Sequence, residues 1–143
     1  MYVLDVNVLI YAFRRDSPQH PACYAWLNGS LATGESVGVP SWVELAVLRI
    51  NTLPSLGDLA APLKDVLAFL YELRSHPSYQ LVEPGPKHLP IFEDLCQRLG
   101  LRGNDLNDAF IAALAIEHGA PLVSTDRGFA RFPGLRRIDP LET

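Results

Sequence analysis

MYVLDVNVLIYAF, the sequence of residues 1–13, contains a short β-forming run, an acid and then an apolar helical stretch. The β-forming run covers residues 2–5, and the helical pattern continues to Phe13. A run of β-branched and aromatic residues followed by helical periodicity indicates a strand that leads directly into a helix. We therefore expect Asp5 to lie where the first strand ends and the first helix begins.

Strand and helix signals alternate along the rest of the chain. Further strands are expected at residues 36–40, 80–82, 121–124 and 137–139. Helices are expected at residues 18–31, 41–50, 59–74, 87–99 and 106–118, with a loop at residues 51–58. This alternation predicts an α/β fold in which right-handed crossovers join parallel strands.

Residues that are favoured at helix ends stand at several of these boundaries. Ser17 is a candidate N-cap with Pro18 at the first helical position, and Ser41 is a candidate N-cap for the helix at 41–50. Gly100 and Gly119 follow two other helices, where glycine is favoured.

Composition predicts one domain spanning residues 1–143. Apolar residues make up 48% of the chain and charged residues 20%, which is ordinary for a globular protein. No apolar run is long enough to cross a bilayer, so no membrane association is expected, and the first residues do not resemble a secretory signal. The two cysteines are far apart without CxxC spacing, which favours reduced thiols and a cytoplasmic location.

Four acids fall at expected junctions between strands and helices: Asp5, Glu44, Asp108 and Asp126. In open parallel sheets, sites form beyond the carboxyl ends of the strands, where such side chains can converge. Carboxylates that are forced together repel one another unless a cation lies among them. The leading interpretation is a divalent-metal site that acts on phosphate.

Each acid also has a purely structural interpretation. Asp5 could cap the helix that follows it, and Glu44 stands at capping-box spacing, three residues after the proposed cap of its helix. Asp105 and Asp108 share a helix face, where acids in the first turn are stabilised by the helix dipole. Asp126 could begin a turn. The combination of all four at such junctions favours the metal site.

The charge balance leaves the question of a nucleic-acid partner open. A formal net charge of -4 argues mildly against one, but setting the four acids aside leaves zero. Arginines crowd the C-terminal end, and arginine suits bidentate phosphate contact. A solvated charged surface would have the same composition. The candidates for RNA contact are Arg127, Arg131, Arg136 and Arg137.

The motifs together resemble a known family. Residues 2–12, 40–45, 103–114 and 124–135 resemble, in this order, the acidic motifs of PIN-domain ribonucleases, and among these the VapC-type toxins of bacterial toxin–antitoxin pairs. The resemblance covers nearly the whole chain. It implies a PIN-like three-layer α/β/α domain with a central parallel sheet of about four to five strands.

The resemblance also implies a function and a set of site residues. The function would be that of a metal-dependent endoribonuclease acting on single-stranded or looped RNA. Carboxylates suit Mg²⁺ or Mn²⁺, and the implied ligands are Asp5, Glu44, Asp108 and Asp126, with Asp105 as an additional candidate. Asn7 and Ser124 are expected to orient a ligand carboxylate or a water molecule. The implied partners are RNA, a cognate antitoxin and a second copy of the chain in a homodimer.

Two positions depart from the family pattern. Gly128 stands where many relatives carry a further acid before the phenylalanine, so a second metal ion would be held more weakly. Asp105 is an extra acid close to Asp108, and the motif favours Asp108 as the ligand.

Three other classes of protein fit the sequence less well. A haloacid-dehalogenase-type phosphatase would use Asp5 as a nucleophile but needs a second acid two residues later, where Asn7 stands. A receiver module needs an acidic pair and a central phospho-acceptor, and neither pattern is present. A non-catalytic RNA-binding or interaction domain would have no physical need for the four acids.

Overall fold

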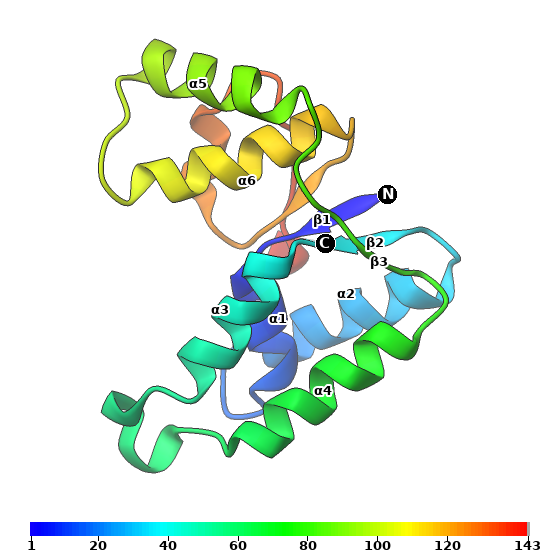
Figure 1. Ribbon diagram of the computed structural model, residues 1–143. Helices are drawn as coiled ribbons and strands as arrows, with labels where there is room; N and C mark the ends of the chain where they lie inside the picture. Colours follow the sequence, from blue (N-terminus) through cyan, green and yellow to red (C-terminus); the bar gives the residue numbers. More distant parts are fainter. Residues whose placement is uncertain (143) are drawn as a thin grey trace.

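A parallel sheet of five strands forms the centre of the protein in the computed structural model, which describes residues 1–142 (Figure 1). The strand order is β3-β2-β1-β4-β5, and every neighbouring pair is parallel. The strands are β1 (Tyr2–Leu4), β2 (Val37–Val39), β3 (Tyr79–Leu81), β4 (Leu122–Val123) and β5 (Arg137–Ile138). The expected strand count and parallel topology are confirmed.

Helices cover both faces of the sheet. Figure 1 shows α5 and α6 on one side and the four preceding helices on the other, which is the expected three-layer arrangement. The α-helices are α1 (Val6–Phe13), α2 (His20–Ala32), α3 (Ser41–Asn51), α4 (Leu63–Ser75), α5 (His88–Leu99) and α6 (Asp105–Glu117). Short 3-10 helices lie at Pro54–Leu59, Arg127–Arg131 and Pro140–Glu142.

The inner strands lie in the hydrophobic core. Val3 and Leu4 of β1, Val37 of β2 and Leu122 and Val123 of β4 are completely buried. Helix α6 is buried over much of its length, and its small alanines let it pack closely against α5. Because helices cover both faces of the sheet, these strands are apolar runs without polar alternation.

The chain reverses its direction across the sheet between β1 and β4. Strand β1 pairs with β2 on one side and β4 on the other, with Val3 opposite Leu122 and Leu4 opposite Val123. Helices that follow β1 and β2 lie on one face, and those that precede β4 lie on the other (Figure 1). Such a switch point leaves a crevice beyond the carboxyl ends of the two strands.

Two expected helix starts are wrong. Helix α2 begins at His20 after Gln19, not at Pro18. The reason is that the Ser17 hydroxyl donates a hydrogen bond to the Arg14 carbonyl, 2.9 Å away, and so serves the end of α1. Ser41 is the first residue of α3 rather than its cap, and its backbone N–H donates to the Glu83 carboxylate at 3.0 Å.

The region between α3 and α4 also differs from expectation. The segment expected as a loop contains a 3-10 helix at Pro54–Leu59, and the following helix begins at Leu63 rather than at residue 59. Pro62 precedes that helix in an extended conformation (ψ 138°), and a proline also restricts the residue before it to extended backbone. A helix therefore cannot run through this point. Strand β3 also lies one residue earlier than expected.

No helix within residues 1–142 combines the length and the apolar character that crossing a membrane requires.

The close approach of β1 and β2 to Val82 gives a stability prediction at Gly38. A Cβ at this position would lie 2.5 Å from Val82 Cγ2 and 3.1 Å from the Tyr2 carbonyl oxygen. We expect Gly38→Ala to lower the free energy of unfolding by about 1–3 kcal/mol, measured by urea denaturation.

Gly29 provides the matched control. It lies in helix α2, and a Cβ added there would have no atom of a neighbouring residue within 4 Å, so Gly29→Ala should raise the stability by about 0.5–1 kcal/mol. A Gly38→Ala protein as stable as the parent would contradict the prediction, because the surroundings of β2 would then accommodate the added methyl group without cost.

Candidate metal centre

Asp5 lies at the junction between β1 and α1 and caps the helix. Its Oδ1 accepts a hydrogen bond from the Val6 backbone N–H at 2.8 Å. Its Oδ2 accepts from the Ser124 hydroxyl at 2.8 Å and from the Asn7 side-chain amide at 3.1 Å. The capping interpretation is therefore confirmed, but capping uses only one of the two carboxylate oxygens.

Asn7 and Ser124 form a network that joins the two strands at the switch point. The Asn7 side-chain amide donates to Ser124 Oγ at 3.1 Å, and its Oδ1 accepts from the Thr125 backbone N–H at 3.2 Å. Ser124 Oγ also accepts from the Asp126 backbone N–H at 3.1 Å. Asn7 and Ser124 thus hold the Asp5 carboxylate in one orientation.

Asp108 enters from the first turn of α6 and shares an arginine with Asp105. The Arg131 Nη2 atom lies 3.1 Å from Asp108 Oδ2 and 3.3 Å from Asp105 Oδ1. The guanidinium also stacks over the Phe132 ring, 4.6 Å from its centroid. Arg131, a candidate for RNA contact from the sequence, therefore offsets part of the negative charge of the two acids of α6 in this structure.

Asp126 follows β4 and begins the 3-10 helix Arg127–Arg131. Its Oδ1 accepts from the Gly128 backbone N–H at 2.8 Å, so it acts as an N-cap, and its side chain is exposed. The turn interpretation is confirmed. The second carboxylate oxygen has no hydrogen bond within residues 1–142 and remains able to bind a ligand.

Asp108 and Asp126 act electrostatically on Asp5. Burial raises the pKa of Asp5 above its ordinary value, and the charges of Asp108 and Asp126 raise it further. Hydrogen bonds from Ser124 and the Val6 backbone oppose this shift by stabilising the ionised form. The structure therefore brings three of the four predicted acids to one edge of the sheet.

Glu44 is buried where α3 meets α4 and β3. Its carboxylate accepts hydrogen bonds from Arg74 Nε and Nη2, at 3.1 and 3.0 Å, and from the Tyr79 hydroxyl at 2.8 Å. Burial and the Glu44 carboxylate together raise the pKa of Tyr79 to about 12. These contacts tie α3 to α4 and β3, so Glu44 has a structural role here and makes no capping box.

The other arginines near the C-terminus are engaged with the protein itself. Arg136 donates to the Gly119 carbonyl at 3.1 Å. Arg137 is largely buried and pairs with Asp139 at 3.1 Å. Arg127 is 83% exposed and lies 3.7 Å from Glu142. Of these three arginines, Arg127 has the guanidinium most accessible to RNA.

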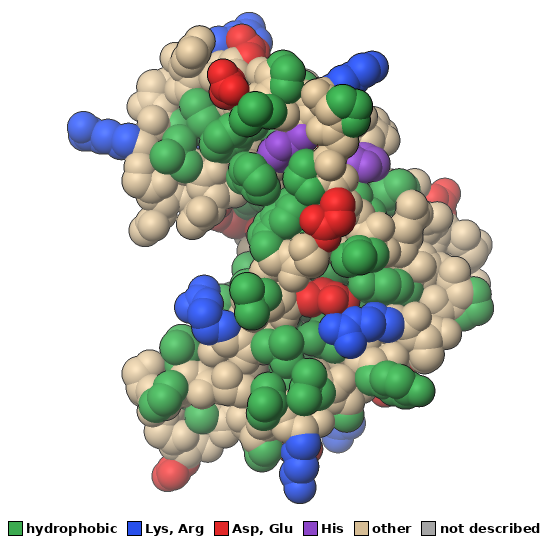
Figure 2. Space-filling model, in the orientation of Figure 1, with side chains coloured by type: hydrophobic (Ala, Val, Ile, Leu, Met, Phe, Trp, Pro, Cys, Tyr) green, Lys and Arg blue, Asp and Glu red, His purple; other side chains and the backbone are tan. Residues whose placement is uncertain are grey.

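A cavity of about 550 Å³ lies beside the aspartates, between α3 and α6. Figure 2 shows the hollow between the α5–α6 layer and the layer that contains α3. The residues that line the cavity include Asp5 and Asp108 together with Trp42, Ala46 and Arg49 of α3. Sequence reasoning missed Trp42 and Arg49 as site residues, although their seven-residue spacing puts them on one helix face.

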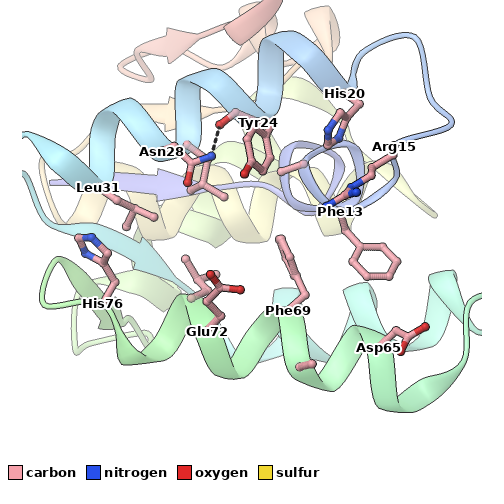
Figure 3. A pocket seen from close by; sticks show the side chains of 14 residues that line it. Phe13, Arg15, His20, Tyr24, Asn28, Leu31, Asp65, Phe69, Glu72 and His76 are labelled. Carbon is pink, nitrogen blue, oxygen red and sulfur yellow. Dashed lines mark hydrogen bonds between the residues drawn. The ribbon is translucent and has the colours of Figure 1, made fainter.

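A second concavity of about 500 Å³ lies between α2 and α4, next to the end of α1. Figure 3 shows Tyr24 and Phe69 pointing into this groove from its two walls, with His20 beside Tyr24. Phe13 packs edge-on against Phe69, with ring centroids 5.5 Å apart. None of Asp5, Asp108 and Asp126 lines this groove, which is separate from the cavity between α3 and α6.

The chemistry of the donor set suits a hard divalent cation. The carboxylates of Asp5, Asp108 and Asp126 supply oxygen atoms, and these are ligands that Mg²⁺ and Mn²⁺ prefer. Within residues 1–142, no three His, Cys, Asp or Glu side chains are already arranged to hold an ion. Because Asp108 Oδ2 contacts Arg131 Nη2, a cation that binds Asp108 through this oxygen has to displace Arg131.

The chain is similar to proteins of known family. The family model described as PIN domain matches residues 2–135. Ribonuclease VapC25 of Mycobacterium tuberculosis is 36% identical over 140 residues, covering 98% of this chain and 99% of the relative. Ribonuclease VapC33 of the same species is 36% identical over 143 residues, covering 99% of each.

Solved structures share the fold at lower sequence identity. VapBC2 from Rickettsia felis, crystallised with a promoter DNA fragment, has a chain with a TM-score of 0.71 and 23% identity, covering 96% of this chain and 97% of that one. FitAcB from Neisseria gonorrhoeae gives a TM-score of 0.66 and 18% identity over the full length of both chains.

The raised pKa of Asp5 predicts a stability effect with a defined pH dependence. Ionised Asp5 opposes folding, so Asp5→Asn should have a higher free energy of unfolding than the parent at neutral pH in EDTA. The gain should shrink as the pH falls and vanish below 3.8, the ordinary aspartate value, because Asp5 is then neutral in both states.

Asp94→Asn is the control, since Asp94 lies in an exposed pair on α5 and should change stability by less than about 0.5 kcal/mol. A destabilised Asp5→Asn protein at neutral pH would contradict the electrostatic account.

Proposed function

This chain belongs to the PIN-domain family, and from that premise we propose that it is a metal-dependent endoribonuclease, the toxin of a toxin–antitoxin pair that acts in the cytoplasm. The observation that carries the proposal is the convergence of Asp5, Asp108 and Asp126 at the switch point of the sheet. Relatives that are 35–36% identical over nearly the whole chain are named VapC ribonucleases, which supports the same activity.

We propose the three aspartates as ligands of Mg²⁺ or Mn²⁺, with Asp105 close by as an additional acid. When bound, the ion would offset charge on the phosphodiester and lower the pKa of an attacking water molecule. Glu44 is left out of the proposed ligand set because Arg74 and Tyr79 already occupy its carboxylate.

The surrounding residues have distinct tasks in this proposal. Ser124 and Asn7 hold Asp5 Oδ2 and so position the ligand, and the Ser124 hydrogen bond opposes the rise in the pKa of Asp5. Arg131 balances the charge of Asp108 until the cation arrives. The substrate is single-stranded or looped RNA, because a duplex hides the base edges that a cavity of this kind can contact.

The groove between α2 and α4 is the proposed binding surface for a helix of the antitoxin. An amphipathic helix binds such a groove through apolar anchors, which Tyr24, Phe13 and Phe69 can receive. Ala68 is exposed in the groove, so Ala68→Glu should abolish co-purification with the antitoxin while RNA cleavage persists. Undiminished co-purification would show that the antitoxin binds another surface.

We also propose a homodimer, on the basis of the family, and sedimentation of the purified protein tests it.

The nuclease proposal is tested by cleavage of a mixed RNA pool with Mg²⁺, Mn²⁺ or EDTA. We expect cleavage only with metal, and a loss of about a hundredfold or more in Asp5→Asn, because removing a ligand costs several kcal/mol of transition-state stabilisation. Ser124→Ala should lose about 10- to 100-fold.

Glu44→Gln separates the structural role of Glu44 from a catalytic one. It should keep the cleavage rate of the parent within a few-fold while lowering the unfolding temperature. Cleavage in EDTA, or by Asp5→Asn at the rate of the parent, would refute the metal-dependent mechanism. A Glu44→Gln protein that is folded but inactive would restore Glu44 to the site.

A further inference from the structure

Helix α3 presents a continuous face to the cavity beside the aspartates. Trp42, Ala46 and Arg49 lie at positions i, i+4 and i+7 and all line this cavity together with Asp5 and Asp108. The helix therefore forms one wall of the proposed active site and supplies both an aromatic ring and a positive charge.

Arg49 is the cation of this wall. It is exposed, and within residues 1–142 its side chain makes no hydrogen bond or ion pair. Arg74, in contrast, is held by Glu44, and Arg131 is held by the acids of α6. An arginine with all its donors unused, facing a cavity next to carboxylates, suits an anion with planar oxygen geometry such as a phosphate.

Trp42 supplies an aromatic surface that is held from behind. It is half-buried and packs edge-on against Phe110 of α6, with ring centroids 5.1 Å apart. Phe110 in turn contacts Phe92 at 5.3 Å and the buried His88 at 4.4 Å. This packing fixes the indole at the cavity wall, where a rigid aromatic face can stack on a base of any sequence.

We propose that Trp42 and Arg49 form a nucleotide-binding subsite for single-stranded RNA, in which a base stacks on Trp42 and Arg49 binds a backbone phosphate. The subsite rests on the proposed nuclease function and adds the residues that hold the strand. Seven residues of helix separate the two side chains by about 10 Å along the axis, so they contact the strand at different points. The strand then runs along α3 past the aspartates.

The proposal predicts the salt dependence of RNA binding. In the Asp5→Asn background with Mg²⁺, which prevents cleavage, the affinity for a fluorescent single-stranded RNA pool is measured by anisotropy across a KCl series. Arg49→Ala should reduce the slope of log affinity against log salt by about 0.7, the value for one phosphate contact on a single strand. Arg102→Ala is the matched control, because Arg102 is exposed and lies outside the cavity, and its slope should equal that of the background.

Stacking is tested by two replacements of Trp42. Trp42→Ala should weaken RNA binding by about 5- to 150-fold, the range for loss of one stacked base, whereas Trp42→Phe should recover most of the affinity. Circular dichroism and urea unfolding verify that each variant is folded. Rescue by phenylalanine shows that the RNA requires an aromatic ring and not the indole N–H, and the folding measurements exclude a general loss of packing as the cause.

The outcomes distinguish the subsite from the nuclease proposal. RNA binding by the background protein with an unchanged slope in Arg49→Ala, or an unchanged affinity in Trp42→Ala, would overturn the subsite while leaving the nuclease intact. No RNA binding by the background protein would overturn both. A flattened slope in Arg49→Ala together with weakening in Trp42→Ala that phenylalanine rescues would establish the subsite.

Discussion

Repulsion among three carboxylates at one sheet edge is the constraint on which the rest of the site depends. Asp5 is partly buried at the end of β1, and the charges of Asp108 and Asp126 make its ionisation harder. Hydrogen bonds or an ion pair therefore stabilise the negative charge of each acid locally. Asp5 accepts three hydrogen bonds, Asp108 faces Arg131, and Asp126 accepts from the Gly128 N–H. A divalent cation bound among the three carboxylates would stabilise all of their negative charges at once.

Much of this arrangement could be predicted from the sequence because it depends on local patterns and on topology. Apolar runs that end in an acid place Asp5 and Asp126 after strands, and parallel topology then brings the carboxyl ends of β1 and β4 to one edge. Asp108 follows from its position in the first turn of α6. The register between neighbouring strands and the contact of Asp108 with Arg131 depend on tertiary packing, which the spacing of motifs does not contain.

Helical geometry places Glu44, the acid of the second motif, on the side of α3 that faces away from the cavity. Trp42 and Ala46 face the cavity, and Glu44 stands two residues from each, so it must lie on the opposite side of α3. There it meets Arg74, thirty residues later in the chain, and Tyr79 of β3. The same periodicity identifies Arg49 as a cavity residue. The cavity between α3 and α6 and the groove between α2 and α4 are distinct. Helix α1 reaches both, but Val6 at its start lines the cavity and Phe13 at its end lines the groove.

The central claim is that three aspartates, without Glu44, form a single metal site. Calorimetric titration of Mn²⁺ into the RNA-free protein tests it most directly, with Asp5→Asn, Asp108→Asn and Glu44→Gln measured beside the parent. We expect saturable binding by the parent and by Glu44→Gln, and loss of binding in both aspartate variants. Binding that survives in the aspartate variants, or that disappears in a folded Glu44→Gln protein, would contradict it.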